Sequence, residues 1–126
     1  RAGWQYPFGD LFRDGATLAM GSDWPVSSPD PIAGIHVAVN RVFPGAPAGT
    51  PPLDAGQSLP LAVAMAAYTA GSAHVNRLDG VSGSIAVGHR ADLVVLDRNP
   101  FDEPTGDIAD ARVARTYIDG DLVHQA

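Results

Sequence analysis

The chain has 126 residues, a formal net charge of −6 and 45% hydrophobic residues, which fits one modest globular domain. Its eight basic residues are all arginines scattered singly, which argues against a nucleic-acid partner, because phosphate binding needs clustered positive charge. No apolar run approaches the roughly 18 to 20 residues that span a bilayer, and no cysteine is present for a disulfide or a thiolate metal site.

The first predicted element is the segment ATLAMGS, residues 16–22, which is short and almost wholly apolar. Such a run predicts a β-strand buried on both faces, as in parallel α/β sheets. Asp23 and then Trp24-Pro25 follow at once, so a carboxylate stands where the predicted strand gives way to a turn. An aspartate before such a turn commonly bonds its own backbone, and the local residues leave this role open beside a catalytic one.

Helical signals follow this turn. Asp30 as N-cap and Pro31 at the first helical position predict a helix that runs to Asn40-Arg41. Residues 43–57 are rich in proline and glycine and predict a long loop. Ser58 is then expected to cap a second helix over about residues 59–68, whose run LAVAMAAY predicts burial nearly all round. A short third helix is expected over about residues 72–78, closed by Asp79-Gly80.

Beyond Gly83 the pattern changes to that of β-strands. The run ADLVVLD predicts one strand, and RVARTYI-DG-DLV predicts two more, joined by Asp119-Gly120 as a two-residue hairpin turn. Asp92 and Asp97 bracket the first of these strands and are expected to bond backbone groups, because a carboxylate in such a place needs partners. The last third of the chain therefore predicts part of a small β domain.

Three stretches together resemble a known family. GSDWPV, AYTAGSAHVNRLDGVSGSIAVGHRADLVVLDRNPF and TYIDGDLV are similar to the C-terminal end of metal-dependent amidohydrolases, in the amidohydrolase family 3 branch. The similarity runs over about residues 16–123. It implies an α/β fold: the C-terminal fragment of a (β/α)8 TIM barrel, with residues 16–22 as its eighth strand, plus part of a small β-sandwich-like subdomain. We expect residues 1–81 to belong to the barrel and residues 82–126 to the β subdomain.

The resemblance also implies a role for Asp23, which matches the family's aspartate at the C-terminal end of the eighth strand. Chemistry in these barrels takes place on that face. Asp23 is therefore expected to be both a metal ligand and a catalytic residue. It would take a proton from water bound to a divalent metal, expected to be zinc, and pass it to the leaving nitrogen. The implied substrate is a small molecule with a non-peptide amide or cyclic amide bond.

The four histidines add no local metal motif. His36, His74, His89 and His124 form no H-x-H pair and no i, i+4 pair. In the resembling family the other ligands lie on earlier barrel strands, so this chain is expected to supply at most one. His36, on the first of the two longer predicted helices, is open to a structural or a substrate-contact role, and the other three histidines are expected to be exposed.

A complete barrel needs about 250 residues, so we expect this chain, which begins without Met, to be inactive alone and to belong to a longer parent protein. The expected partner of the apolar strand is the remainder of the barrel, in the same parent chain or a separate one, or a second copy in a homo-oligomer. A non-catalytic fragment or assembly module, and a small β-rich binding domain, are the alternatives. The N-terminus has no signal-peptide pattern, so the expected location is the cytoplasm.

Overall fold

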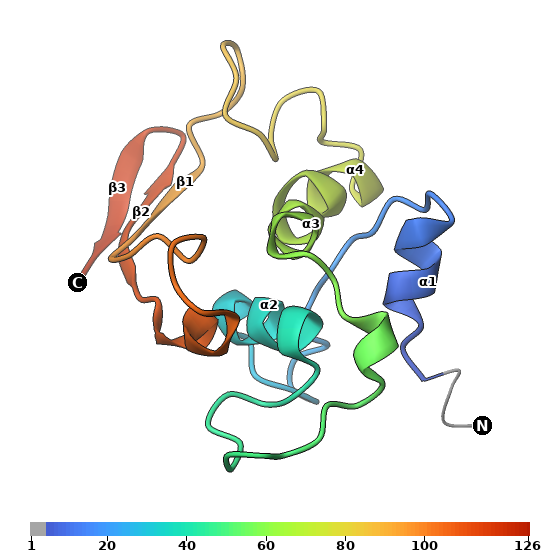
Figure 1. Cartoon of the computed structure of the whole chain (residues 1–126). Helices are drawn as coiled ribbons and strands as arrows, with labels where there is room; N and C mark the ends of the chain where they lie inside the picture. The colour runs from blue at the N-terminus through green and yellow to red at the C-terminus, as the bar shows by residue number, and fades with distance from the viewer. Residues whose placement is uncertain (1–4) are drawn as a thin grey trace.

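A computed structural model describes residues 5–126 as a group of helices beside a small antiparallel sheet (Figure 1). The elements are, in order, α1 (Phe8–Arg13), α2 (Pro31–Asn40), η2 (Ala55–Gln57), α3 (Leu61–Ala66), η3 (Ala67–Gly71), α4 (Ser72–Val75), β1 (Leu93–Leu96), η4 (Thr105–Asp110), β2 (Val113–Ile118) and β3 (Asp121–Gln125). The first four residues of the expected 1–81 unit lie outside this description. No helix within residues 5–126 is long and apolar enough to cross a bilayer.

Helix α2 begins where the sequence predicts. The Asp30 carboxylate accepts a hydrogen bond of 2.9 Å from the backbone N–H of Ile32, and Pro31 occupies the first turn. The helix ends at Asn40, and the C-cap residue Arg41 is buried and lies in the left-handed region with φ 58°. The Arg41 Nε donates to the carbonyl of Leu53 at 2.8 Å, so this arginine fastens the following loop to the end of the helix.

Elements α3, η3 and α4 follow one another without a break and form a single helix with a π-helical turn at Ala67–Gly71. The predicted boundaries are therefore wrong. Ser58 does not cap the helix, because Pro60 occupies the N-cap position and makes no side-chain bond. The separate third helix predicted over residues 72–78 is the end of this one, and it stops at Val75.

The burial of this helix is one-sided. Ala64, Ala67 and Ala73 are buried, whereas Ala62 and Ala66 on another side are exposed. The expectation that the run LAVAMAAY is buried nearly all round is therefore wrong for the described part of the chain. Alanine and leucine favour the helix wherever they point, and which side becomes buried depends on neighbours that the local pattern does not reveal.

Residues 16–22 do not form the predicted β-strand. A strand needs a hydrogen-bonded neighbour, and the three strands of residues 5–126 pair only with one another. The segment runs instead along the helix that contains η3. The backbone N–H of Met20 donates to the carbonyl of Ala67 at 3.1 Å, and the Ser72 hydroxyl donates to the carbonyl of Met20 at 3.0 Å.

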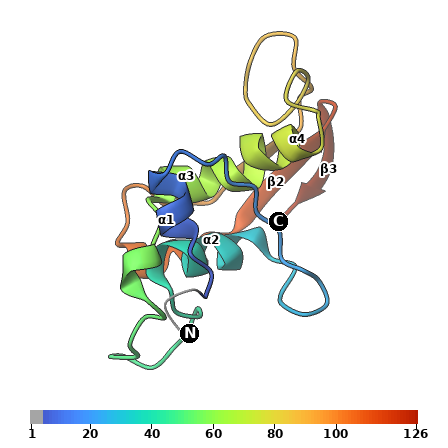
Figure 2. The ribbon, with the colours of Figure 1, turned by 90° about the vertical axis from the view of Figure 1, so that its right-hand side faces the viewer.

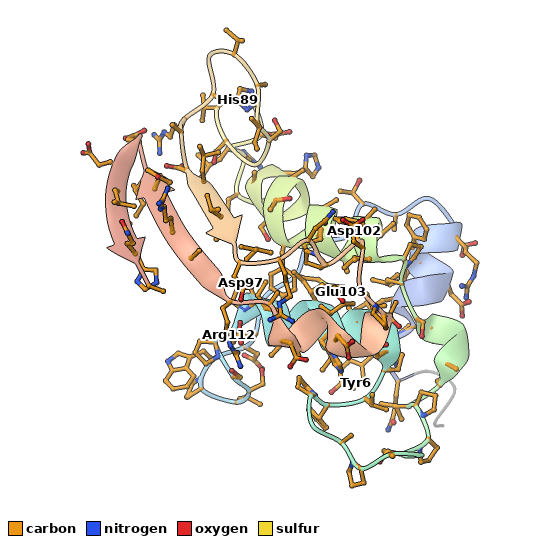
Figure 3. The ribbon with its side chains drawn as sticks, turned by 60° about the vertical axis from the view of Figure 1, so that its left-hand side comes forward. Tyr6, His89, Asp97, Asp102, Glu103 and Arg112 are labelled. Atoms are coloured by element: carbon orange, nitrogen blue, oxygen red, sulfur yellow. The ribbon has the colours of Figure 1, made fainter. Side chains whose placement is uncertain are left out.

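The sheet has the strand order β1-β2-β3, with both pairs antiparallel. Asp119 and Gly120, with φ of 50° and 87°, form the turn between β2 and β3, and this confirms the predicted hairpin. The carboxylate of Asp97 accepts from the backbone N–H of Arg112 at 2.8 Å (Figure 3), and that of Asp92 accepts from the backbone N–H of Asp119 at 3.0 Å. Both aspartates thus bond backbone groups of the sheet, as predicted.

The hydrophobic core joins the helices to the segment that carries η4. Its buried members are Ile32, Ile35, Ala38, Leu59, Ala64, Ile108 and Ala111. Leu96 of β1 packs against this cluster, and the Asn40 side chain donates to the carbonyl of Thr105 at 2.8 Å. The described chain is therefore a mixed helix and strand structure with a small antiparallel sheet. The boundary between residues 81 and 82 stays a prediction.

Candidate functional site

Asp23 lies where the segment of residues 16–22 passes into the loop before α2, and this loop projects away from the helices in Figure 2. Its φ of 53° places it in the left-handed region, which costs a non-glycine residue roughly 1 to 2 kcal/mol. The carbonyl of Asp23 accepts from the backbone N–H of Val26 at 2.8 Å, and the Ser27 hydroxyl donates to the carbonyl of Ser22. Backbone and serine groups therefore close this turn.

The Asp23 carboxylate is exposed and has no hydrogen-bond partner within residues 5–126. Asp30, seven residues later, shows the contrast, because its carboxylate caps α2. The turn role that the sequence left open for Asp23 required a bond from its side chain to the backbone, and no such bond forms in the described part. Both oxygens are free to accept a proton or to bind a cation, while the catalytic and ligand roles stay predictions.

A metal centre needs more than this one carboxylate. Protein sites for zinc use three or four protein ligands, and residues 5–126 contain no group of three or more His, Asp or Glu side chains that could hold an ion. The chemistry of Asp23 suits a divalent cation, because an ionised carboxylate is an acceptor only. The structure therefore offers Asp23 as a single ligand, and the remaining ligands would come from outside the described residues.

His36 is buried on α2, with 4% of its surface exposed, and its Nδ1 has no hydrogen-bond partner within residues 5–126. Burial lowers the pKa of His36 below its usual value of 6.5, and the negative charge of Asp110 opposes this effect. The residue lines a cavity of about 310 Å³ between α2 and the loop of residues 42–52. Burial among helices favours the structural role for His36, one of the two that the sequence left open.

The other histidines differ from one another. His74 and His124 are exposed, as expected, whereas His89 is half-buried, with its Nδ1 3.1 Å from the Ser84 hydroxyl. The Nδ1 of His74 lies 3.1 Å from an Asp79 oxygen, and this hydrogen bond lowers the pKa of Asp79. Both residues of that pair line an apolar groove of about 540 Å³ between residues 16–18 and the exposed alanines of the helix.

Two residues near the site were missed by the sequence reasoning. Ser72 was assigned to the start of a separate helix and Gly71 to no element, yet both contact the segment that leads to Asp23. The available signal was a glycine and a serine inside an apolar helical run. Glycine in such a place costs about 1 kcal/mol relative to alanine and often marks a close approach of another backbone.

Known proteins resemble this chain over almost its whole length. A model of the amidohydrolase family matches residues 1–124. The N-substituted formamide deformylase of Arthrobacter pascens is 33% identical over 121 residues, which cover 95% of this chain and 21% of that protein. The protein LONG AFTER FAR-RED 3 of Arabidopsis thaliana is 36% identical over 115 residues, 91% of this chain and 19% of that protein.

A solved structure of an amidohydrolase is also similar to this chain. The crystal structure of an amidohydrolase from Thermotoga maritima MSB8 matches 94% of this chain and 26% of its own, with a TM-score of 0.64 and 26% identity. The chain spans about a fifth of the length of the two curated relatives. Because the family model matches nearly every residue and a solved amidohydrolase shares the fold, the chain belongs to the amidohydrolase family, as the sequence resemblance predicted.

Proposed function

We propose that this chain is the C-terminal part of a metal-dependent hydrolase that breaks carbon–nitrogen bonds in non-peptide amides or cyclic amides. Membership of the amidohydrolase family supports the reaction class, and one relative is named for removing the formyl group from N-substituted formamides. The observation that carries the proposal is the Asp23 carboxylate, which is exposed and makes no hydrogen bond within residues 5–126. An aspartate whose carboxylate closed the turn would be bonded to the backbone of that turn.

The proposed chemistry assigns two tasks to Asp23. A bound divalent cation, expected to be zinc, would polarise the amide carbonyl and lower the pKa of a bound water towards about 7. One Asp23 oxygen would hold the cation, and the carboxylate would accept the proton of the attacking water and deliver it to the leaving nitrogen.

We propose further that the chain is inactive alone and acts with the remainder of a barrel, in the same parent chain or a separate one. The backbone N–H groups of residues 17–19 have no hydrogen-bond partner within residues 5–126. Unpaired backbone groups along an apolar segment favour pairing with another strand. The described part also holds no group of side chains sufficient for a metal centre, so the other ligands would come with the same partner.

The test begins with the intact mass and metal content of the purified protein, either the full-length parent or this chain with its partner. We expect a species larger than 13.1 kDa with stoichiometric zinc or another transition metal, which hydrolyses members of a panel of N-alkylformamides and cyclic amides. Asp23→Asn should abolish turnover and leave the unfolding temperature nearly unchanged. Asp14→Asn is the matched control, because it removes the same charge at an exposed position before the segment of residues 16–22.

Two results would contradict the proposal. Turnover that survives Asp23→Asn would remove the assigned proton transfer. A full-length parent, or a complex of this chain with its partner, that binds no metal and hydrolyses nothing in the panel would favour the alternative of a non-catalytic fragment or assembly module.

A further inference from the structure

The π-helical turn η3 and the residue after it, Ser72, bind the N–H and the carbonyl of Met20, three residues before Asp23. The N–H of Met20 donates to the carbonyl of Ala67 at 3.1 Å, and the carbonyl of Met20 accepts from the Ser72 hydroxyl at 3.0 Å. The same hydroxyl lies 3.0 Å from the carbonyl of Ala67. These three contacts connect Ser72, Ala67 and Met20, and we call them the Ser72 clamp.

Gly71 makes this arrangement possible. A Cβ atom on Gly71 would lie 1.9 Å from the carbonyl oxygen of Leu18, so the segment rests directly on the backbone of the helix. Single π-turns inside α-helices are rare and occur frequently at functional sites. Here the carbonyl of Ala67, in the turn, and the hydroxyl of Ser72, directly after it, contact Met20, and no strand pairs with residues 18–20 within residues 5–126.

The geometry points to Ser72 as a positioning residue for Asp23, and this inference rests on the proposed function of Asp23. Only Gly21 and Ser22 separate the clamped Met20 from Asp23. On the far side of Asp23, Val26 and Ser27 hold the carbonyls of Asp23 and Ser22. The backbone on both sides of the carboxylate is therefore fixed, while the carboxylate has no partner of its own within residues 5–126. Its position depends on these backbone contacts.

The chemical reason for such a clamp is the short range of the steps assigned to Asp23. Holding a cation and passing a proton both require a carboxylate oxygen within hydrogen-bonding or bonding distance of its target. A misplacement of about 1 Å can cost on the order of 100-fold in rate, and loss of groups that orient a metal ligand typically costs about 10- to 100-fold in metal affinity or activity. Ser72 touches neither metal nor substrate in this scheme and acts through Asp23.

The test compares three variants in the zinc-loaded full-length protein, or in the complex if the chain has a separate partner. Ser72→Ala removes the hydroxyl, and Ser72→Thr keeps it. Thr69→Ala is the matched control, because the Thr69 hydroxyl lies on the same π-turn but donates only to the helix carbonyls of Met65 and Ala66. Zinc loss to a chelator is the first readout, and kcat and KM for an N-alkylformamide are the second.

We expect Ser72→Ala to shorten the half-time of zinc loss and to lower kcat, each about 10-fold, with KM changed less than about twofold. Ser72→Thr should restore most of both values, and Thr69→Ala should match the wild type. Wild-type zinc retention and kcat in a folded Ser72→Ala protein would overturn the inference, as would equal losses in Thr69→Ala. A Ser72→Ala protein that does not fold would also reject it, because Ser72 would then support the fold as a whole.

Asp23→Asn, measured alongside, separates the two proposals. If Asp23→Asn abolishes turnover while Ser72→Ala behaves as the wild type, only the positioning role fails. If Asp23→Asn retains turnover, the proposed function of Asp23 fails first, and the role of Ser72 fails with it.

Discussion

Replacing Gly71 with alanine tests the contact between the π-turn and the segment that leads to Asp23. The added Cβ would lie 1.9 Å from the Leu18 oxygen, 3.0 Å from the Leu18 carbonyl carbon and 3.3 Å from the Ala19 Cα. Even weak C–H···O contacts have carbon to oxygen distances of about 3.3 Å, so the two backbones must separate by more than about 1 Å. No side chain can yield instead, because all three obstructing atoms belong to the backbone.

The magnitude follows from three contributions. Overpacking of this kind costs about 1 to 3 kcal/mol, and the separation also weakens the Met20 to Ala67 hydrogen bond, worth about 1 kcal/mol. Alanine is better than glycine in a helix interior by about 1 kcal/mol, which offsets part of this cost. We therefore expect Gly71→Ala to lower the free energy of unfolding by about 1 to 3 kcal/mol.

Urea unfolding followed by far-ultraviolet circular dichroism measures this change. Gly106→Ala in η4 is the matched control, because no atom lies within 4 Å of its added Cβ and its backbone is not left-handed. The control should stay within about 0.5 kcal/mol of the wild type. Equal stability of Gly71→Ala and Gly106→Ala would refute the reasoning, since the helix and the segment would then not lie in contact.

Two further predictions concern α2. Burial holds the pKa of His36 below 6.5 in the folded chain. At pH values between 6.5 and that lower pKa, the unfolded chain therefore binds more protons than the folded chain. The free energy of unfolding should fall as the pH is lowered through this window. His36→Phe should flatten this pH dependence in urea titrations, and an unchanged slope would contradict the assigned burial. Asp30→Ala should cost about 1 kcal/mol, because the N–H of Ile32 loses its cap, and an unchanged urea midpoint would show that the cap contributes nothing.

The features that the sequence predicted well depend on neighbouring residues. The pair Asp30-Pro31 starts a helix because Asp30 caps it and Pro31 suits its first turn. The pair Asp119-Gly120 places two residues with positive φ in a tight hairpin turn. Asp97 and its backbone partner at Arg112 are fixed by the register of adjacent strands. In the first two cases the groups lie within a few residues of each other, so local rules suffice, whereas Asp97 and Arg112 are 15 residues apart and meet through the antiparallel pairing of β1 and β2.

The features that the sequence did not predict depend on backbone groups far away along the chain. The sequence analysis predicted a break in the helix before Ser72, whereas the helix continues and Gly71 is explained by its contact with Leu18, more than fifty residues earlier. Asp23 follows the apolar segment directly in the sequence, but its free carboxylate and left-handed backbone could be known only from the structure. The contact of Ser72 with the carbonyl of Met20 could not be predicted, because the two residues are 52 positions apart and the acceptor is a backbone group.

For the segment of residues 16–22, the prediction from sequence was only partly useful. Its apolar composition predicts a strand buried on both faces, yet Ala16, Thr17 and Ala19 are exposed and no strand pairs with it within residues 5–126. One side of the segment is held by the Ser72 clamp, so the helix already covers one face. A neighbouring strand would satisfy both the unpaired backbone and the remaining apolar face. This combination favours a partner that supplies a sheet over one that supplies only a helix, and it supports the proposal that the remainder of a barrel pairs here.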